Sequence, residues 1–258
     1  MSGAKVVLED AGDGVRVIRL ADPRRRNAID RVLRDELVAA AAAVASDAAA
    51  RSLVLRADGP SFCSGADLVE TFGGADRKSV AEVRADLVRI YEAILCIRDL
   101  EIPTVAAVRG AAIGAGLNLA LACDVRLAAP DASFAALFSR IGLHPGGGCS
   151  YLLTEAMGPQ RAIRVLLDGE TLEANTAARA GLVDEVVDDP EARALEAAHR
   201  WARLDPELAR GIKRSVRLAK TEGLAASLEF ESWAQAASAR KPRIQELVAE
   251  RLARSTRS

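Results

Sequence analysis

Short apolar runs alternate with longer amphipathic segments in the first half of the chain, and this alternation limits the folds that the sequence can adopt. The runs 15–20, 52–56 and 104–108 have the length of single β-strands and are apolar at most positions. The segment that begins near Asp30 and residues 79–98 instead repeat apolar side chains at a spacing close to 3.6, which is typical of helices. A chain that alternates in this way is expected to form an α/β fold.

The second half of the chain has a different pattern. Beyond about residue 150 the sequence is mostly helical, and Pro190 and Pro206 stand at expected helix starts, where the missing N–H of proline does no harm. The tail from residue 207 onward is amphipathic and is interrupted near Pro242. We therefore expect a core over residues 1–190 and a helical C-terminal region over residues 191–258.

Charge and composition argue against several classes of partner. The 35 Lys and Arg residues nearly balance the 36 Asp and Glu residues, so no broad basic surface and no nucleic-acid partner are expected. No apolar run reaches the roughly eighteen residues of a membrane span, and the first ten residues do not resemble a secretory signal. The 4 cysteines show no metal-binding spacing and the chain has only 2 histidines, so we expect a cytoplasmic protein without a metal site.

A glycine motif in the middle of the chain suggests one alternative function. Gly110, Gly114 and Gly116 follow an expected strand and precede an expected helix, which is the context in which short-chain dehydrogenases hold a pyrophosphate. However, a dinucleotide-binding fold usually opens with this motif, whereas here about three strands precede it. Those enzymes also need a tyrosine with a lysine four positions later, and neither of the 2 tyrosines has one. A nicotinamide enzyme is therefore disfavoured.

Six small-residue segments, taken in order, point elsewhere. They are RNAI at 26–29, FCSGADL at 62–68, GAAIGAG at 110–116 with ACD at 122–124, GLHPGGG at 142–148, GPQRA at 158–162 and AGLV at 180–183. With these segments in this order and at these spacings, nearly all of residues 5–255 resembles the crotonase superfamily, the enoyl-CoA hydratase/isomerase family.

The resemblance implies a fold, a ligand and an assembly. The fold is an α/β, crotonase-type spiral of repeated strand–strand–helix units, and the C-terminal helices form a trimerisation region. The implied partners are an acyl-CoA and further copies of the chain in a homotrimer or hexamer. No cofactor is required, because the coenzyme A thioester is itself the substrate or ligand. Fatty acid metabolism is the implied setting.

The resemblance also implies an oxyanion hole. Reactions of this family pass through a thioester enolate, whose developing negative charge needs preorganised N–H donors. By resemblance, the donors are the backbone amides of Ala66 and Ala115, and the neighbouring small residues let the thioester approach the backbone closely. Asp67 is expected to cap a following helix. The implied ligand-binding residues are Arg26, Ala28, Ser64, Gly65, Asp67, Leu68, Val69 and Gly114.

The acid–base positions are where the chain departs from the family. Asn118 and Phe138 stand at the positions of the two usual glutamates, and neither side chain can exchange a proton at neutral pH. His144 has two interpretations: a substitute base, since histidine takes up and releases protons near neutral pH, or a brace that bonds a backbone carbonyl of its loop. We expect Cys63 and Cys149 to be packing residues, because no base is fixed beside either. The three arginines at 24–26 either contact the phosphates of coenzyme A or form an ordinary solvated loop, and both interpretations stay open.

Two classes of function follow. The chain is either an enzyme, a crotonase-type lyase, hydratase or isomerase with non-standard acid–base groups, or a non-catalytic acyl-CoA-binding or carrier protein on the same fold. Standard hydration is doubtful in both cases, because the two glutamates are absent.

Overall fold

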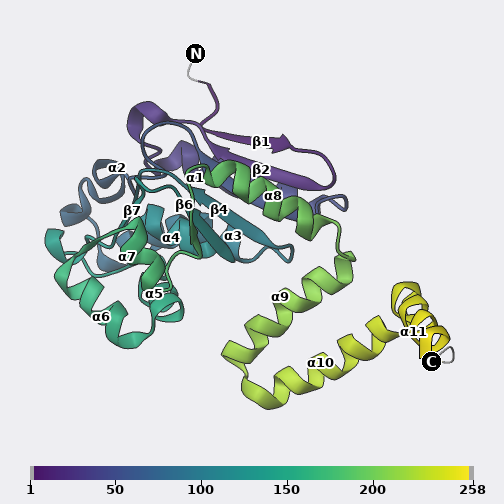
Figure 1. The fold of residues 1–258 in the computed structure, drawn as a ribbon. Coiled ribbons are helices and arrows are strands. Elements are labelled where there is room, and N and C mark those ends of the chain that lie inside the picture. Colours follow the sequence, from purple (N-terminus) through teal and green to yellow (C-terminus); the bar gives the residue numbers. More distant parts are fainter. Residues whose placement is uncertain (1–2, 256–258) are drawn as a thin grey trace. The chain divides into compact units, whose positions relative to one another are not determined.

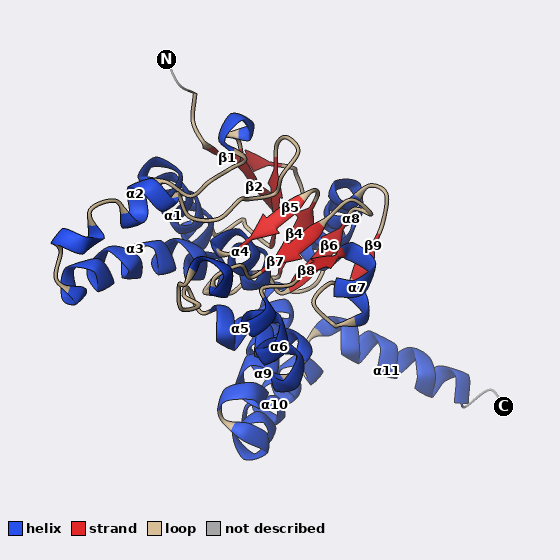
Figure 2. Ribbon diagram, turned by 90° about the vertical axis from the view of Figure 1, so that its left-hand side faces the viewer, coloured by secondary structure: helices blue, strands red, loops and turns tan. Residues whose placement is uncertain are grey.

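The computed structural model describes residues 3–255 and divides into two compact units, which meet in the chain between Arg203 and Leu204. The first unit is built on a six-stranded sheet with the order β1-β2-β3-β4-β6-β9 (Figures 1 and 2). Its strands are β1 (Val6–Asp10), β2 (Val15–Leu20), β3 (Ser52–Ala57), β4 (Thr104–Val108), β6 (Val125–Ala128) and β9 (Glu185–Val186). Only β1 runs antiparallel to its neighbour, and all other pairs are parallel. The predicted α/β class is confirmed.

The central strands are buried on both faces, which explains their nearly continuous apolar sequence. Ile18, Leu53 and Leu55 belong to the main core beneath the helices of one face. Val17 and Val54, which are the immediate neighbours of these residues in the two strands, belong to a smaller core on the opposite face. Because successive side chains of a strand point to opposite faces, one short run supplies both cores.

The smaller core includes α8 (Pro190–Ala202), which packs on β3 and β4 through Ala194 and Ala198. The sequence placed the boundary of the core at residue 190, whereas the structure keeps this helix in the first unit and divides the chain after Arg203. The sequence shows a helix that begins at Pro190, but its apolar spacing does not reveal whether the helix packs on the sheet. The expected boundary at residue 190 therefore precedes the observed one.

A second, three-stranded sheet has the order β5-β7-β8. It is formed by β5 (Ala111–Ile113), β7 (Ser133–Ala135) and β8 (Thr171–Glu173). The sequence predicts a loop over residues 109–116, no strand at 133–135 and mostly helix beyond residue 150, so β5, β7, β8 and the short β9 are corrections. These strands have two or three residues each, too few to show a period.

The remaining helices of the first unit begin close to where their sequence signals place them. Asp30 caps α1 by accepting a hydrogen bond from the Leu33 amide at 2.9 Å, and Ser79 and Glu82 form a reciprocal capping box at the start of α3. The helices are α1 (Arg31–Ser46), α2 (Leu68–Phe72), α3 (Val80–Arg98), α4 (Ala115–Ala122), α5 (Cys149–Met157), α6 (Pro159–Asp168) and α7 (Ala174–Arg179), with 3₁₀ turns η1 (Pro23–Arg25), η2 (Ala75–Arg77) and η3 (Ser139–Ile141).

The second unit consists of α9 (Pro206–Thr221), α10 (Gly223–Ala239) and α11 (Pro242–Ser255). Asp205 caps α9 and also accepts a hydrogen bond from Lys241 at 2.6 Å, which ties the start of α11 to the start of α9. Leu208, Ile212 and Val216 follow one another at four-residue spacing along α9, and all three are exposed. The predicted helical tail is confirmed, while its role in assembly stays a prediction.

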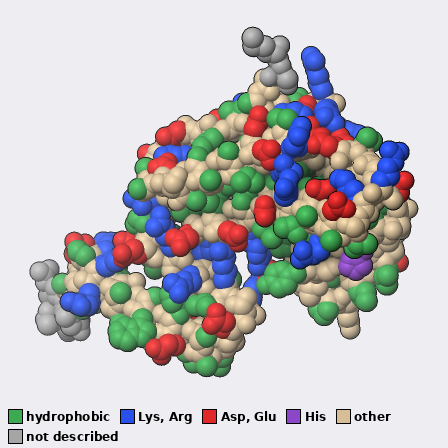
Figure 3. Space-filling view, turned by 180° about the vertical axis from the view of Figure 1, so that it is seen from behind, with side chains coloured by type: hydrophobic (Ala, Val, Ile, Leu, Met, Phe, Trp, Pro, Cys, Tyr) green, Lys and Arg blue, Asp and Glu red, His purple; other side chains and the backbone are tan. Residues whose placement is uncertain are grey.

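The described part of the chain holds no helix long and apolar enough to cross a bilayer. Lys and Arg side chains are interspersed with Asp and Glu over the face drawn in Figure 3. Within residues 3–255 there is also no group of three or more His, Cys, Asp or Glu side chains that could hold a metal ion.

Candidate active site

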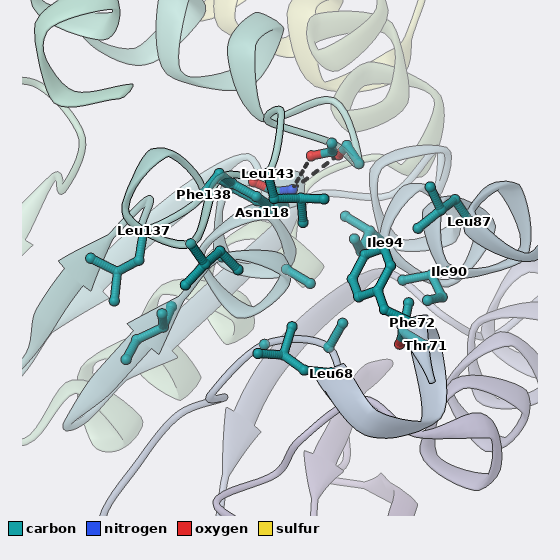
Figure 4. A pocket seen from close by; sticks show the side chains of 18 of the residues that line it. Leu68, Thr71, Phe72, Leu87, Ile90, Ile94, Asn118, Leu137, Phe138 and Leu143 are labelled. Carbon is teal, nitrogen blue, oxygen red and sulfur yellow. Dashed lines mark hydrogen bonds between the residues drawn. The ribbon is translucent and has the colours of Figure 1, made fainter. Parts of the chain in front are cut away.

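A cavity of about 220 Å³ lies within the first unit, between α2 and α3 on one side and the segments 113–118 and 137–147 on the other (Figure 4). Most of the side chains that line it are aliphatic or aromatic. The lining residues are Ser64, Gly65, Ala66, Leu68, Thr71, Phe72, Leu87, Ile90, Tyr91, Ile94, Ile113, Gly114, Ala115, Asn118, Leu137, Phe138, Ile141, Leu143, His144, Gly146 and Gly147.

Two backbone segments at the cavity wall are in direct contact, and glycine makes this contact possible. A Cβ atom added to Gly116 would lie 2.2 Å from the Cys63 carbonyl oxygen. A Cβ added to Gly65, whose φ is +96°, would lie 2.7 Å from the Ile113 carbonyl oxygen and 3.5 Å from the Ala115 nitrogen. No side chain fits at either place, so the start of α4 lies directly against residues 63–66.

The backbone amide of Ala66 points away from Ile29, the residue that lies opposite it in an isolated β-bridge. Ile29 donates to the Gly65 carbonyl at 2.8 Å and accepts from the Asp67 amide at 3.0 Å, which is the pattern of a parallel bridge opposite Ala66. In this pattern the amide between the two bonded residues faces the other side. No acceptor for the Ala66 amide occurs among residues 3–255.

The amide of Ala115 is free for a different reason. Ala115 is the first residue of α4, and the first N–H groups of a helix have no acceptor within it. The helical backbone at Ala115 accommodates a Cβ, whereas Gly114 before it has φ +54°. Within the described chain, neither Ala66 nor Ala115 has an amide acceptor, and both residues line the same cavity.

Asn118 lies one turn further along α4 and is only 1% exposed. Its Nδ2 donates to the carbonyl oxygens of Gly146 at 2.8 Å and Gly147 at 3.3 Å, and these bonds are drawn in Figure 4. They fix the orientation of the side-chain amide, because a reversed amide would set Oδ1 against two acceptors. Oδ1 itself has no partner in the described chain.

Phe138 reaches the same cavity from the segment before η3. A Cβ added to Gly114 would lie 3.8 Å from Phe138 Cζ, so the ring covers the start of α4. The structure thus brings Asn118 and Phe138 together at one wall (Figure 4). Neither of them can transfer a proton.

His144 lines the exposed rim of the cavity. Its Nδ1 lies 2.8 Å from the Pro145 carbonyl oxygen. Because a carbonyl can only accept, this contact requires a proton on Nδ1, so in the neutral ring Nε2 carries the lone pair. His144 therefore makes the hydrogen bond to a carbonyl of its own loop that the bracing role predicts. This bond does not involve Nε2, which can still act as a base.

Comparison with known proteins identifies the family. The family model described as enoyl-CoA hydratase/isomerase matches residues 10–251. The chain belongs to the enoyl-CoA hydratase/isomerase family. It is 41% identical over 225 residues to the probable enoyl-CoA hydratase EchA14 of Mycobacterium tuberculosis, covering 87% of this chain and 85% of that protein.

Further relatives support this membership and the fold. A probable enoyl-CoA hydratase of Rhodobacter capsulatus is 37% identical over 231 residues, covering 86% of this chain and 85% of that protein. The crystal structure of an enoyl-CoA hydratase from Bacillus anthracis superposes with a TM-score of 0.87 at 29% identity, covering 96% of each chain. The predicted crotonase-type fold is thereby confirmed.

The ligand-binding residues expected from the family resemblance fall into two groups. Ser64, Gly65, Leu68 and Gly114 line the cavity together with the two alanines. The other four, which are Arg26, Ala28, Asp67 and Val69, lie outside its lining.

Two residues of the second group, Arg26 and Asp67, make hydrogen bonds or ion pairs that support the surrounding loops. The Arg26 carbonyl accepts from the Ser64 amide at 3.0 Å, so its backbone supports the loop. Asp67 caps α2 through the Glu70 amide, as predicted, and pairs with Arg25, which also pairs with Asp30. Of the arginine run, Arg25 is therefore held by carboxylates.

The cysteines behave as packing residues. Cys63 is fully buried and its Sγ donates to the Asn27 carbonyl at 3.0 Å. Burial raises the pKa of the Cys63 thiol to about 12 and that of the Cys149 thiol to about 12. Neither thiol lines the cavity, so neither is placed to act as a nucleophile.

Tyr91 is one of the cavity residues that were not predicted from the sequence. It falls on the apolar face of α3 with Leu87, Ile90 and Ile94, and this spacing predicted a core position. The structure places this face at the cavity rather than wholly in the core. The only available signal was a hydroxyl group within an otherwise aliphatic stripe.

Proposed function

We propose that this protein binds an acyl-CoA thioester in the cavity and stabilises its enolate through the amides of Ala66 and Ala115. The observation that carries the proposal is the pair of acceptor-free amides on two segments that touch each other and line one apolar cavity. Preorganised donors in a site shielded from water stabilise a developing oxyanion strongly, by about 3–4 kcal/mol for one donor.

The names of the relatives support an enzyme of the lyase or isomerase class acting on a coenzyme A thioester. EchA14 and the Rhodobacter capsulatus protein are both named enoyl-CoA hydratases. The proposed chemistry needs no further cofactor, because the two amides supply the electrostatic stabilisation.

The lining of the cavity favours a neutral aliphatic acyl group. Among the described residues that line it there is no Lys, Arg, Asp or Glu, whereas Leu87, Ile90, Ile94 and Leu143 contribute aliphatic surface. A charged acyl group would enter without a partner of opposite charge, which is costly in an apolar site.

The reaction needs an acid–base group in place of the two missing glutamates. Asn118 and Phe138 cannot move protons, and we propose His144 as the candidate base because its Nε2 has an available lone pair at the cavity rim. The presence of Asn118 and Phe138 in place of glutamates also favours the alternative function, a non-catalytic acyl-CoA-binding or carrier protein that keeps the amide pair.

Several finer assignments belong to the same proposal. Arg26, Ala28, Asp67 and Val69 are proposed to contact the coenzyme A portion. Asp67 and Val69 flank the lining residue Leu68 in sequence, and the segment of Arg26 and Ala28 is bonded to the lining residue Ser64 through the Arg26 carbonyl. A trimer or hexamer through the second unit, a cytoplasmic location and a role in fatty acid metabolism follow from the family resemblance. The exposed apolar residues of the second unit, among them Leu224, Leu228 and Trp233, support self-association.

Replacing the Ala66 amide tests the proposed site. Ala66→Pro removes one N–H donor, and we expect butyryl-CoA to bind about tenfold more weakly, since one hydrogen bond contributes about 0.5–1.5 kcal/mol. Ala66→Gly keeps the donor and is the matched control, with affinity within a few-fold of wild type. Isothermal titration calorimetry on folded variants measures both. If Ala66→Pro binds as tightly as wild type, the Ala66 amide is not a donor.

A further inference from the structure

Tyr91 places a hydroxyl group at the wall of the cavity. It is held by α3, whose side chains Leu87, Ile90 and Ile94 line the same cavity. A Cβ added to Gly146 would lie 2.5 Å from Tyr91 Oη, so the phenol oxygen rests directly on the backbone of that glycine. A rigid helix and a glycine contact therefore fix its position.

The phenol borders the position where the family resemblance places a glutamate. A Cβ added to Gly147 would lie 2.8 Å from Asn118 Nδ2 and 3.5 Å from Tyr91 Cδ1. The tyrosine ring and the Asn118 amide thus flank the same glycine. Asn118 in turn lies one helical turn beyond Ala115, whose amide is one of the two proposed donors.

Few side chains at this cavity can carry a transferable proton. In the part of the chain that the structure describes, the lining holds only Tyr91 and His144 as titratable groups. His144 is exposed and bonds its own loop through Nδ1. Tyr91 is half-buried, and its hydroxyl has no hydrogen-bond partner among the residues that the structure describes. A hydroxyl without a partner in an apolar cavity is available to a ligand.

We propose that Tyr91 is a catalytic residue that exchanges a proton with carbon 2 of the bound acyl thioester, an inference that rests on the proposed function. In its phenolate form the oxygen takes the proton from carbon 2. The electron pair of the broken C–H bond forms the enolate double bond, and the negative charge moves to the thioester oxygen at the two amides. The phenol returns a proton to carbon 2 in the reverse step.

Deuterium exchange tests this step without assuming the overall reaction. In deuterated water the phenol proton is replaced by deuterium, so butyryl-CoA gains mass at carbon 2 in the presence of the protein. We expect Tyr91→Phe to slow this exchange by at least about a hundred-fold, the lower end of the usual effect of one acid–base group. Tyr151→Phe changes the other tyrosine, which lies exposed on α5 beneath Arg98, and is expected to leave the exchange unchanged.

The outcomes separate this inference from the proposed function. Exchange at the wild-type rate in Tyr91→Phe, exchange lost in His144→Ala but kept in Tyr91→Phe, or wild-type binding without exchange would each overturn the role of Tyr91. Calorimetric titration of butyryl-CoA shows whether Tyr91→Phe still binds, as expected when only proton transfer is lost. Failure of the wild-type protein to bind butyryl-CoA would instead overturn the proposed function, and the role of Tyr91 with it.

Discussion

Hydration of crotonyl-CoA by the wild-type protein is expected to be at least about a thousand-fold slower than by a family member with glutamates at both acid–base positions. Water addition requires one group to take a proton from water while another delivers one to carbon 2, and each such group contributes about 10²–10⁴-fold. Asn118 and Phe138 line the cavity but can do neither. The loss of enoyl absorbance during turnover measures the rate.

The environment of Asn118 predicts how a restoration experiment will turn out. In Asn118→Glu, the carboxylate would face the carbonyl oxygens of Gly146 and Gly147, which now accept hydrogen bonds from Nδ2. Leaving these carbonyls unpaired beside a buried charge is unfavourable by several kcal/mol. The double variant Asn118→Glu, Phe138→Glu is therefore expected to stay well below a natural two-glutamate enzyme. Rapid wild-type hydration that survives Asn118→Ala, Phe138→Ala, His144→Ala and Tyr91→Phe would mean that the reaction uses another site.

Gly116→Ala is expected to abolish measurable acyl-CoA binding and to lower the free energy of unfolding by at least about 1–3 kcal/mol, the usual effect of overpacking. The added Cβ would lie 2.2 Å from the Cys63 carbonyl oxygen and 2.8 Å from the Cys63 carbonyl carbon. Both are backbone atoms that cannot rotate away. The start of α4 must then move off residues 63–66, which separates the amides of Ala66 and Ala115.

Gly211→Ala is the matched control for this change. Gly211 lies within α9, and a Cβ added there meets nothing within 4 Å. We expect this variant to bind normally and to gain about 0.5–1 kcal/mol of stability, because alanine favours a helix over glycine. Chemical denaturation and calorimetric titration of both variants measure the difference. A Gly116→Ala protein with wild-type stability and affinity would show that the two segments need not touch.

The parts of the fold that were predictable from the sequence have strong local signals. Asp30 and Ser79 cap α1 and α3 where the apolar repeat begins, and the run 104–108 is buried along its whole length. The second sheet has no such signal. Residues 111–113 become a strand because they pair with residues 133–135, far along the chain, and small residues alone do not indicate that partner.

The candidate site also combines features that the sequence predicts with features that only the structure reveals. The family resemblance implied that Ala66 and Ala115 serve one oxyanion hole, but it did not predict that residues 63–66 touch the start of α4. The added-Cβ distances at Gly65 and Gly116 give the physical reason for this contact. The place of Tyr91 could not be predicted, since a helical stripe looks alike whether it faces a packed core or a cavity. The geometry of Asn118 also required the structure, because its partners are carbonyls of residues 146 and 147.

The central claim is that the amides of Ala66 and Ala115 hold the carbonyl oxygen of a thioester. Calorimetric comparison of butyryl-CoA with S-butyl-CoA, the thioether that has a methylene group in place of the carbonyl, tests it most directly. Two hydrogen bonds of about 0.5–1.5 kcal/mol each predict that wild-type protein binds the thioester at least about fivefold more tightly. Equal affinity for the thioester and the thioether would contradict the claim.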